Sequence, residues 1–82
     1  MQTIKDFNQR LKMARCARGI TQVQIAKRIG VTPNTYSRYE TGLNEPNLLN
    51  LVRICDILGV KIDYLLTGEG EAPKATVHEY KA

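Results

Sequence analysis

The sequence predicts an all-α fold, a compact bundle of five short helices joined by tight turns. Three observations predict it. Apolar residues recur at helical spacing in successive stretches, most stretches begin at a capping residue and end at a glycine, and none alternates with the period of a strand. With 82 residues, no tryptophan and one phenylalanine, the chain fits one domain whose modest core is filled by Leu, Ile and Val.

The first two helices each begin at a capping-box spacing. Thr3 and Asp6 have this spacing before the first helix, which should end near Gly19. Its apolar face is Phe7, Leu11 and Ala14. Thr21 and Gln24 repeat the spacing before the second helix. Its apolar stripe, Ile25, Ala26 and Ile29, is closed by Gly30.

The third helix follows a two-residue turn, Gly30-Val31, in which glycine permits a left-handed backbone and Val31 can fill the corner. Thr32 is a suitable N-cap, and Pro33 at the first helical position needs no N–H partner. The helix should run to about Thr41 and end at Gly42. Two short helices with a glycine turn favour a helix-turn-helix motif, although this geometry alone is common in helical proteins.

Two more helices complete the bundle. Asn47 can cap the fourth, which keeps helical spacing at Leu48, Leu51, Cys55 and Leu58 before Gly59. The fifth is short, from Ile62 to Leu66, and ends at Thr67-Gly68. We therefore expect residues 1–67 to form the domain and residues 68–82 a polar, flexible tail. The alternative for the tail is an arm that packs on a second subunit through Val77 and Tyr80.

The net charge of +4 is unevenly distributed. Residues 1–44 hold eight Lys and Arg against two acidic residues, whereas residues 45–82 hold four against six. The first half thus carries a surplus of six positive charges and the second a deficit of two. This asymmetry favours a polyanionic partner for the first half, while an ordinary solvated basic surface remains the alternative.

Several classes of function are disfavoured. No apolar run reaches membrane-spanning length and no signal-peptide pattern is present, so we expect a cytoplasmic protein. Cys16 and Cys55 fit no metal-ligand spacing and are expected to be free, partly buried thiols. His78 is the only histidine and lies in the tail. We expect no catalytic residues, metal, cofactor or small-molecule substrate, and hence no enzyme.

The detailed pattern of residues 10–66 resembles the phage repressor and Cro family, also called the xenobiotic-response-element family of bacterial regulators. The matching residues are Arg15, Gly19-Ile20-Thr21-Gln22, Ile25-Ala26, Gly30-Val31, Tyr36-Ser37-Arg38, Glu40, Gly42, Pro46, Leu51, Leu58-Gly59-Val60 and Leu65-Leu66. The resemblance implies a five-helix lambda-repressor-like domain that binds double-stranded DNA through the helix-turn-helix.

The third helix has a polar face suited to bases. With Tyr36 placed at the core, helical geometry puts Pro33 and Glu40 near that side and Tyr39 beside it. The opposite face holds Asn34, Ser37, Arg38 and Thr41 and no acidic residue. The resemblance implies base contacts from Pro33, Asn34, Ser37 and Arg38. Arginine can fork onto guanine and asparagine onto adenine, whereas proline could at most touch a thymine methyl group.

The resemblance also implies contacts that do not read sequence. Phosphate contacts are expected from Gln22, Thr32, Thr41, Leu43 and Asn44, with Arg10, Lys27 and Arg28 as electrostatic helpers. Gln22 lies at the first turn of the second helix, where free N–H groups favour an anion. Arg15 and Glu40 match a family ion pair that locks the third helix to the first.

These expectations lead to one main hypothesis and one alternative. The main hypothesis is a sequence-specific transcriptional regulator, a repressor, which reads a palindromic operator as a homodimer. The expected dimer interface uses the apolar surface of the fifth helix: Ile62, Tyr64, Leu65 and Leu66. The alternative is an antitoxin-like or anti-repressor module that uses the same helices to bind a protein partner.

Overall fold

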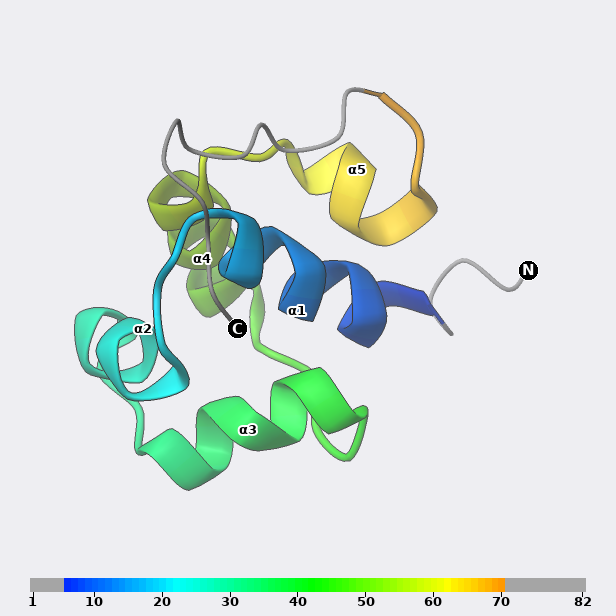
Figure 1. The fold of residues 1–82 in the computed structure, drawn as a ribbon. Helices are drawn as coiled ribbons and strands as arrows, with labels where there is room; N and C mark the ends of the chain where they lie inside the picture. The colour runs from blue at the N-terminus through cyan, green and yellow to red at the C-terminus, as the bar shows by residue number, and fades with distance from the viewer. Residues whose placement is uncertain (1–5, 71–82) are drawn as a thin grey trace.

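A computed structural model describes residues 6–70 of the chain as five α-helices and their connections (Figure 1). The helices are α1 (Phe7–Ala17), α2 (Gln22–Ile29), α3 (Pro33–Thr41), α4 (Leu48–Leu58) and α5 (Ile62–Thr67). No strand occurs within residues 6–70. The predicted all-α, five-helix fold is therefore confirmed.

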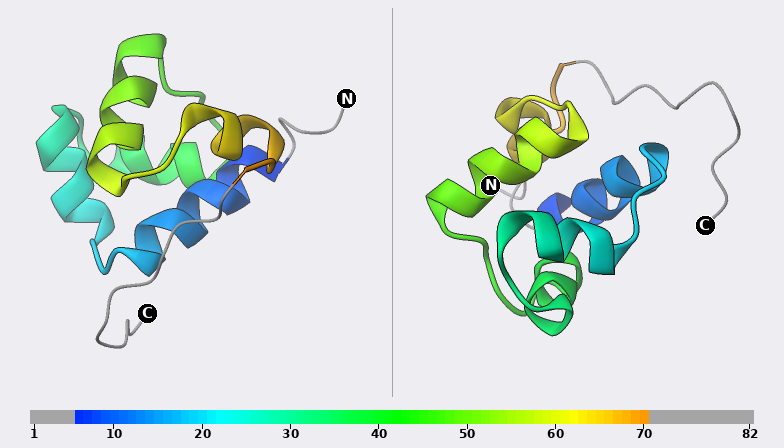
Figure 2. Two further views of the ribbon diagram at one scale, coloured as in Figure 1. Left: turned by 90° about the horizontal axis from the view of Figure 1, so that it is seen from above. Right: turned by 90° about the vertical axis from the view of Figure 1, so that its left-hand side faces the viewer.

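The five helices pack around one shared core. Helices α3 and α5 contact α1 from opposite sides, and α2 contacts both α3 and α4 (Figures 1 and 2). Each helix contributes at least one buried apolar side chain to a single core. The residues of this core are Phe7, Leu11, Ala14, Ile25, Ala26, Ile29, Tyr36, Tyr39, Leu51, Ile54, Leu58, Val60 and Leu65. This arrangement leaves the outer face of α3 along one edge of the molecule.

The capping residues set the helix boundaries as predicted. Thr21 and Gln24 form a reciprocal capping box at the start of α2, while Thr32 and Asn47 accept the N–H groups of Thr35 and Asn50 at the starts of α3 and α4. Helices α2, α3, α4 and α5 all end at a glycine in the left-handed conformation. In the turn between α2 and α3, Gly30 has φ +78° and the following Val31 packs against the core.

The start of the chain differs from the prediction in one detail. Helix α1 begins at Phe7 with Asp6 as its N-cap, and the Asp6 side chain makes no capping hydrogen bond. Thr3 lies outside the described residues, as do His78 and the residues proposed for a dimer arm, Val77 and Tyr80. The predictions for those residues and for the tail therefore stay predictions.

The face of α4 that enters the core differs from the predicted one. Ile54, which the predicted stripe omitted, is fully buried beside Leu51 and Leu58, whereas Leu48 is 72% exposed. The helix places Ile54 between Leu51 and Leu58 on the side that contacts α2 and α5, and Leu48 at its first position projects away from it. Leu48 therefore keeps the helical spacing read from the sequence but lies outside the core.

Candidate nucleic-acid interface

The outer face of α3 presents the side chains expected to contact bases. Pro33, Asn34 and Arg38 are exposed and Ser37 is half-buried. On the opposite side Tyr36 and Tyr39 are buried, and their rings meet edge to face with centroids 5.8 Å apart. The helix is therefore held by aromatic packing on one face and offers an amide, a hydroxyl and a guanidinium on the other.

A buried carboxylate at the end of α3 ties this helix to α1. Arg15 donates from Nε to Oε2 of Glu40 at 2.6 Å and from a terminal nitrogen to Oε1 at 3.1 Å. Its other terminal nitrogen donates to the carbonyl oxygen of Ile20 at 2.8 Å. The predicted Arg15–Glu40 ion pair is present in this geometry, and both side chains are almost completely buried.

Two further donors to Glu40 were not expected from the sequence. The Tyr36 hydroxyl donates to Oε2 at 2.6 Å, and the Gln22 side-chain amide donates to Oε1 at 2.9 Å. The carboxylate thus connects α1, α2 and α3. Tyr36 and Glu40 are one helical turn apart, so their contact is compatible with the sequence pattern of α3. Gln22 and Glu40 are 18 positions apart in different helices, and no local sequence pattern links them.

The same contacts shift the titration of the cluster. Burial alone would raise the pKa of Glu40, but the hydrogen bonds from Arg15, Tyr36 and Gln22 and the charge of Arg15 outweigh it, so this pKa is lowered. Burial and the adjacent Glu40 raise the pKa of the Tyr36 hydroxyl. The cluster is therefore an ionised carboxylate held by a cation and two neutral donors at neutral pH.

Gln22, for which a phosphate contact is expected, lies at the start of α2. It is the first residue of α2, and its side-chain amide uses one of two N–H groups on Glu40. In the same turn the backbone N–H of Gln24 donates to the Thr21 hydroxyl at 3.0 Å. The hydrogen bond to Glu40 holds the Gln22 side chain between the start of α2 and the end of α3.

The loop after α3 is shaped by hydrogen bonds to one carbonyl group. The N–H groups of Leu43 and Asn44 both donate to the Arg38 oxygen, at 3.0 and 3.2 Å, and the Thr41 hydroxyl donates to the same oxygen at 3.3 Å. The side chains of Leu43 and Asn44 remain exposed beside the end of α3. At the other end of α3, exposed Thr32 accepts from the Thr35 N–H at 3.0 Å.

Arg10 lies elsewhere. Its Nε donates to the Leu65 carbonyl oxygen at 3.0 Å, and its guanidinium also lies 4.0 Å from Asp6. This places the side chain on the α5 side of α1, opposite α3 (Figure 1). Arg10 thus satisfies a carbonyl group at the end of α5, and its expected part in phosphate binding stays a prediction.

The structure buries part of the dimer interface that was predicted on α5. Leu65 is completely buried, so it cannot contact a partner. Ile62, Tyr64 and Leu66 are half-buried and pack against the core. The prediction of Leu65 as an interface residue is wrong, and the apolar surface that α5 leaves free is smaller than expected.

The described residues can also be compared with the expectations for cysteines, metal sites and membrane spans. Cys16 and Cys55 are free and half-buried, as predicted, and burial raises the pKa of Cys55. Residues 6–70 contain no group of His, Cys, Asp and Glu that could hold a metal ion. None of the helices in this part of the chain is long and apolar enough to cross a membrane.

The geometry of α2, the glycine turn and α3 agrees with a family match. Residues 11–65 match the model of the helix-turn-helix family. The match runs from within α1 to within α5. The chain belongs to the phage repressor and Cro type of this family. The resemblance seen in the sequence is therefore confirmed.

Similar proteins include two phage-associated regulators. The SPbeta prophage-derived uncharacterized HTH-type transcriptional regulator YonR of Bacillus subtilis is 42% identical over 62 residues, which are 76% of this chain and 57% of YonR. The cryptic phage CTXphi transcriptional repressor RstR of Vibrio cholerae is 42% identical over 59 residues, 72% of this chain and 53% of RstR. The chain thus spans little more than half the length of these helix-turn-helix relatives.

A solved structure has the same fold. The P22 c2 repressor protein, solved in complex with a synthetic operator, superposes with a TM-score of 0.72 and 32% sequence identity. The match covers 77% of this chain and 96% of that one. The lambda-repressor-like fold predicted for this helix-turn-helix protein is therefore confirmed.

Proposed function

We propose that the protein is a sequence-specific DNA-binding transcriptional regulator, a repressor, which inserts α3 into the major groove. The observation that carries the proposal is the outer face of α3. It presents Asn34, Ser37 and Arg38 without an acidic residue, and the buried Glu40 cluster holds it rigidly against α1 and α2. Base edges in the major groove are read by amide, hydroxyl and guanidinium groups, and the anchored helix presents all three.

The roles of the individual residues follow from their positions. Arg38 and Asn34 are proposed to read base edges, Ser37 and Pro33 to contact them more weakly, and Gln22 to bind phosphate. The remaining phosphate contacts are proposed from the two ends of α3: Thr32, Thr41, Leu43 and Asn44. P22 c2, which has the same fold, was solved with an operator, and this supports DNA as the partner here.

We further propose that two copies bind one palindromic operator. A two-fold dimer places its recognition helices about 34 Å apart, one turn of B-DNA, so that each reads one half-site. The family is one of regulators rather than enzymes, and we propose no catalytic activity.

The direct test is a selection of bound sequences from a random duplex library at near-physiological salt. We expect enrichment of a palindrome with half-sites about one helical turn apart. Salt-sensitive retention without enrichment would reject sequence-specific binding. No retention even at low salt would favour the alternative, an antitoxin-like or anti-repressor module that binds protein.

A further inference from the structure

Helix α4 has a second apolar face, directed outward. Leu48, Leu49 and Val52 are 72%, 57% and 52% exposed, although this helix already buries Leu51, Ile54 and Leu58. At about 100° per residue, Leu49 and Val52 lie on the side opposite the buried residues. A helix that is apolar on two faces is typical of one covered on both sides.

This outward face is unusual on the described surface. Only three other large apolar side chains there are strongly exposed, and they lie on three different segments: Met13, Val23 and Leu43. On α4, by contrast, three such side chains fall within five consecutive residues. A contiguous exposed apolar group of this kind marks an interaction surface more often than scattered residues do.

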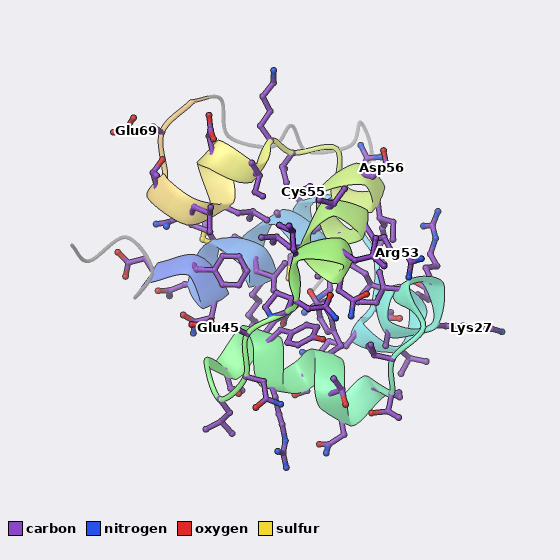
Figure 3. All side chains as sticks on the ribbon, turned by 180° about the vertical axis from the view of Figure 1, so that it is seen from behind. Lys27, Glu45, Arg53, Cys55, Asp56 and Glu69 are labelled. Carbon is purple, nitrogen blue, oxygen red and sulfur yellow. The ribbon has the colours of Figure 1, made fainter. Side chains whose placement is uncertain are left out.

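Two opposite charges complete the face. Arg53 and Asp56 are exposed and lie on the opposite side of α4 from Cys55 (Figure 3). Within the described part of the chain neither charge has an ion-pair partner. The outer face of α4, defined as Leu48, Leu49, Val52, Arg53 and Asp56, therefore has no net charge.

We propose that the outer face of α4 binds the same face of a second copy of this chain. In a two-fold interface each residue meets the same patch of its partner, so a face with one cation and one anion is complementary to itself. Antiparallel α4 helices that cross near Val52 place Arg53 and the partner's Asp56 about five residues, 7.5 Å, apart along the helix axis, within reach of the long arginine side chain. DNA or a strongly charged protein would find no matching charge on this face.

The inference rests on the proposed homodimer but moves its surface from α5 to α4. On α5, Leu65 is buried and its neighbours already pack on the core. The outer face of α4 has the exposed apolar area that α5 lacks, and it is separate from the exposed face of α3.

Sedimentation equilibrium of the complete 82-residue chain without DNA tests the surface. We expect a dimer for the wild type, and at least a tenfold weaker dimer for Val52→Asp. Val23→Asp on α2 is the matched control, because Val23 is 60% exposed and the substitution is identical. It should dimerise like the wild type, and circular dichroism should show both variants folded. A monomeric wild type, or equal effects of the two substitutions, would overturn the proposal.

A mixing experiment tests the charges. Arg53→Asp leaves two acidic residues on the face and Asp56→Arg leaves two basic ones, so each variant alone should be predominantly monomeric. In an equimolar mixture every facing pair is complementary, and a heterodimer should form. A mixture that stays monomeric would show that these charges do not face each other. Because DNA is absent, either result leaves the proposed sequence recognition to be decided by the library selection.

Discussion

At the scale of single residues, α3 separates the side chains proposed to read DNA from the side chains that hold the helix in place. Arg38 and Asn34 project outward, whereas Tyr36 and Glu40 on the same helix are buried. The wheel of α3 predicted this division, because it depends only on the helical period. The hydrogen bond from the Gln22 side chain to Glu40 could not be predicted. These two side chains meet only once α2 and α3 have packed together.

Arg38→Ala is expected to relax base preference at one position of each half-site, with a loss of about 1–3 kcal/mol on the selected sequence. Random duplex should be affected less, because its binding depends on phosphates. Arg18→Ala is the control: Arg18 is an exposed arginine beside Gly59 at the end of α4, and its loss removes the same charge. Equal losses on both duplexes for Arg38→Ala would contradict base reading. Gln22→Ala, by contrast, should weaken all sequences alike.

Glu40→Gln is expected to lower the free energy of unfolding by about 3–5 kcal/mol, because it leaves the buried Arg15 without a counter-charge. Tyr36→Phe removes one hydrogen bond to the carboxylate and should cost about 1.5–3 kcal/mol. Urea unfolding monitored by circular dichroism measures both. If Tyr36→Phe cost as much as Glu40→Gln, the ion pair would not be the dominant interaction of the cluster.

The lowered pKa of Glu40 also predicts a dependence of stability on pH. The unfolded chain takes up this proton at a higher pH than the folded chain does. The contribution of Glu40 to stability is therefore complete above the ordinary glutamate pKa of about 4.3 and is lost as pH falls through the lower folded value. Unfolding at a series of pH values should show this loss in the wild type, whereas Glu40→Gln should lack that component.

At the scale of helices, the sequence is most informative about where each element begins and ends. Thr21, Thr32 and Asn47 cap the helices that their positions predict, since capping is a contact within one turn. The buried faces were less predictable. Leu48 and Ile54 are both compatible with an apolar stripe on α4, and only packing against α2 and α5 decides between them.

The turn between α2 and α3 provides a test at this scale. An added Cβ on Gly30 would have no atom within 4 Å, so Gly30→Ala should be disfavoured by the positive φ alone. We expect a loss of about 1–2 kcal/mol, and a smaller loss for Gly30→Asn, because asparagine tolerates this conformation better. Thermal unfolding of the two variants measures the difference. Equal losses would indicate that the backbone conformation is not the cause.

At the scale of the whole molecule, the two proposed binding surfaces lie on different helices. Residues 1–44, which include α1, α2 and α3, carry the surplus of positive charge, whereas the outer face of α4 is apolar with balanced charges. Charge distribution along the chain predicted a polyanion partner for the first half. It could not predict the surface of α4, because exposure of Leu49 and Val52 is a property of the packed bundle.

The last prediction concerns the electrostatic part of DNA binding. Neutralised phosphates release counterions, so affinity for both random and selected duplexes should fall steeply, and with similar slopes, as salt rises. Asn44→Asp and Lys61→Gln each lower the net charge by one, but Asn44 lies in the loop after α3 whereas Lys61 caps α5 on the other side of α1. Titrations at several salt concentrations should show a larger loss for Asn44→Asp, on both duplexes, that shrinks as salt screens the added charge. Equal losses would mean that net charge, and not the position of the added charge relative to α3, governs binding.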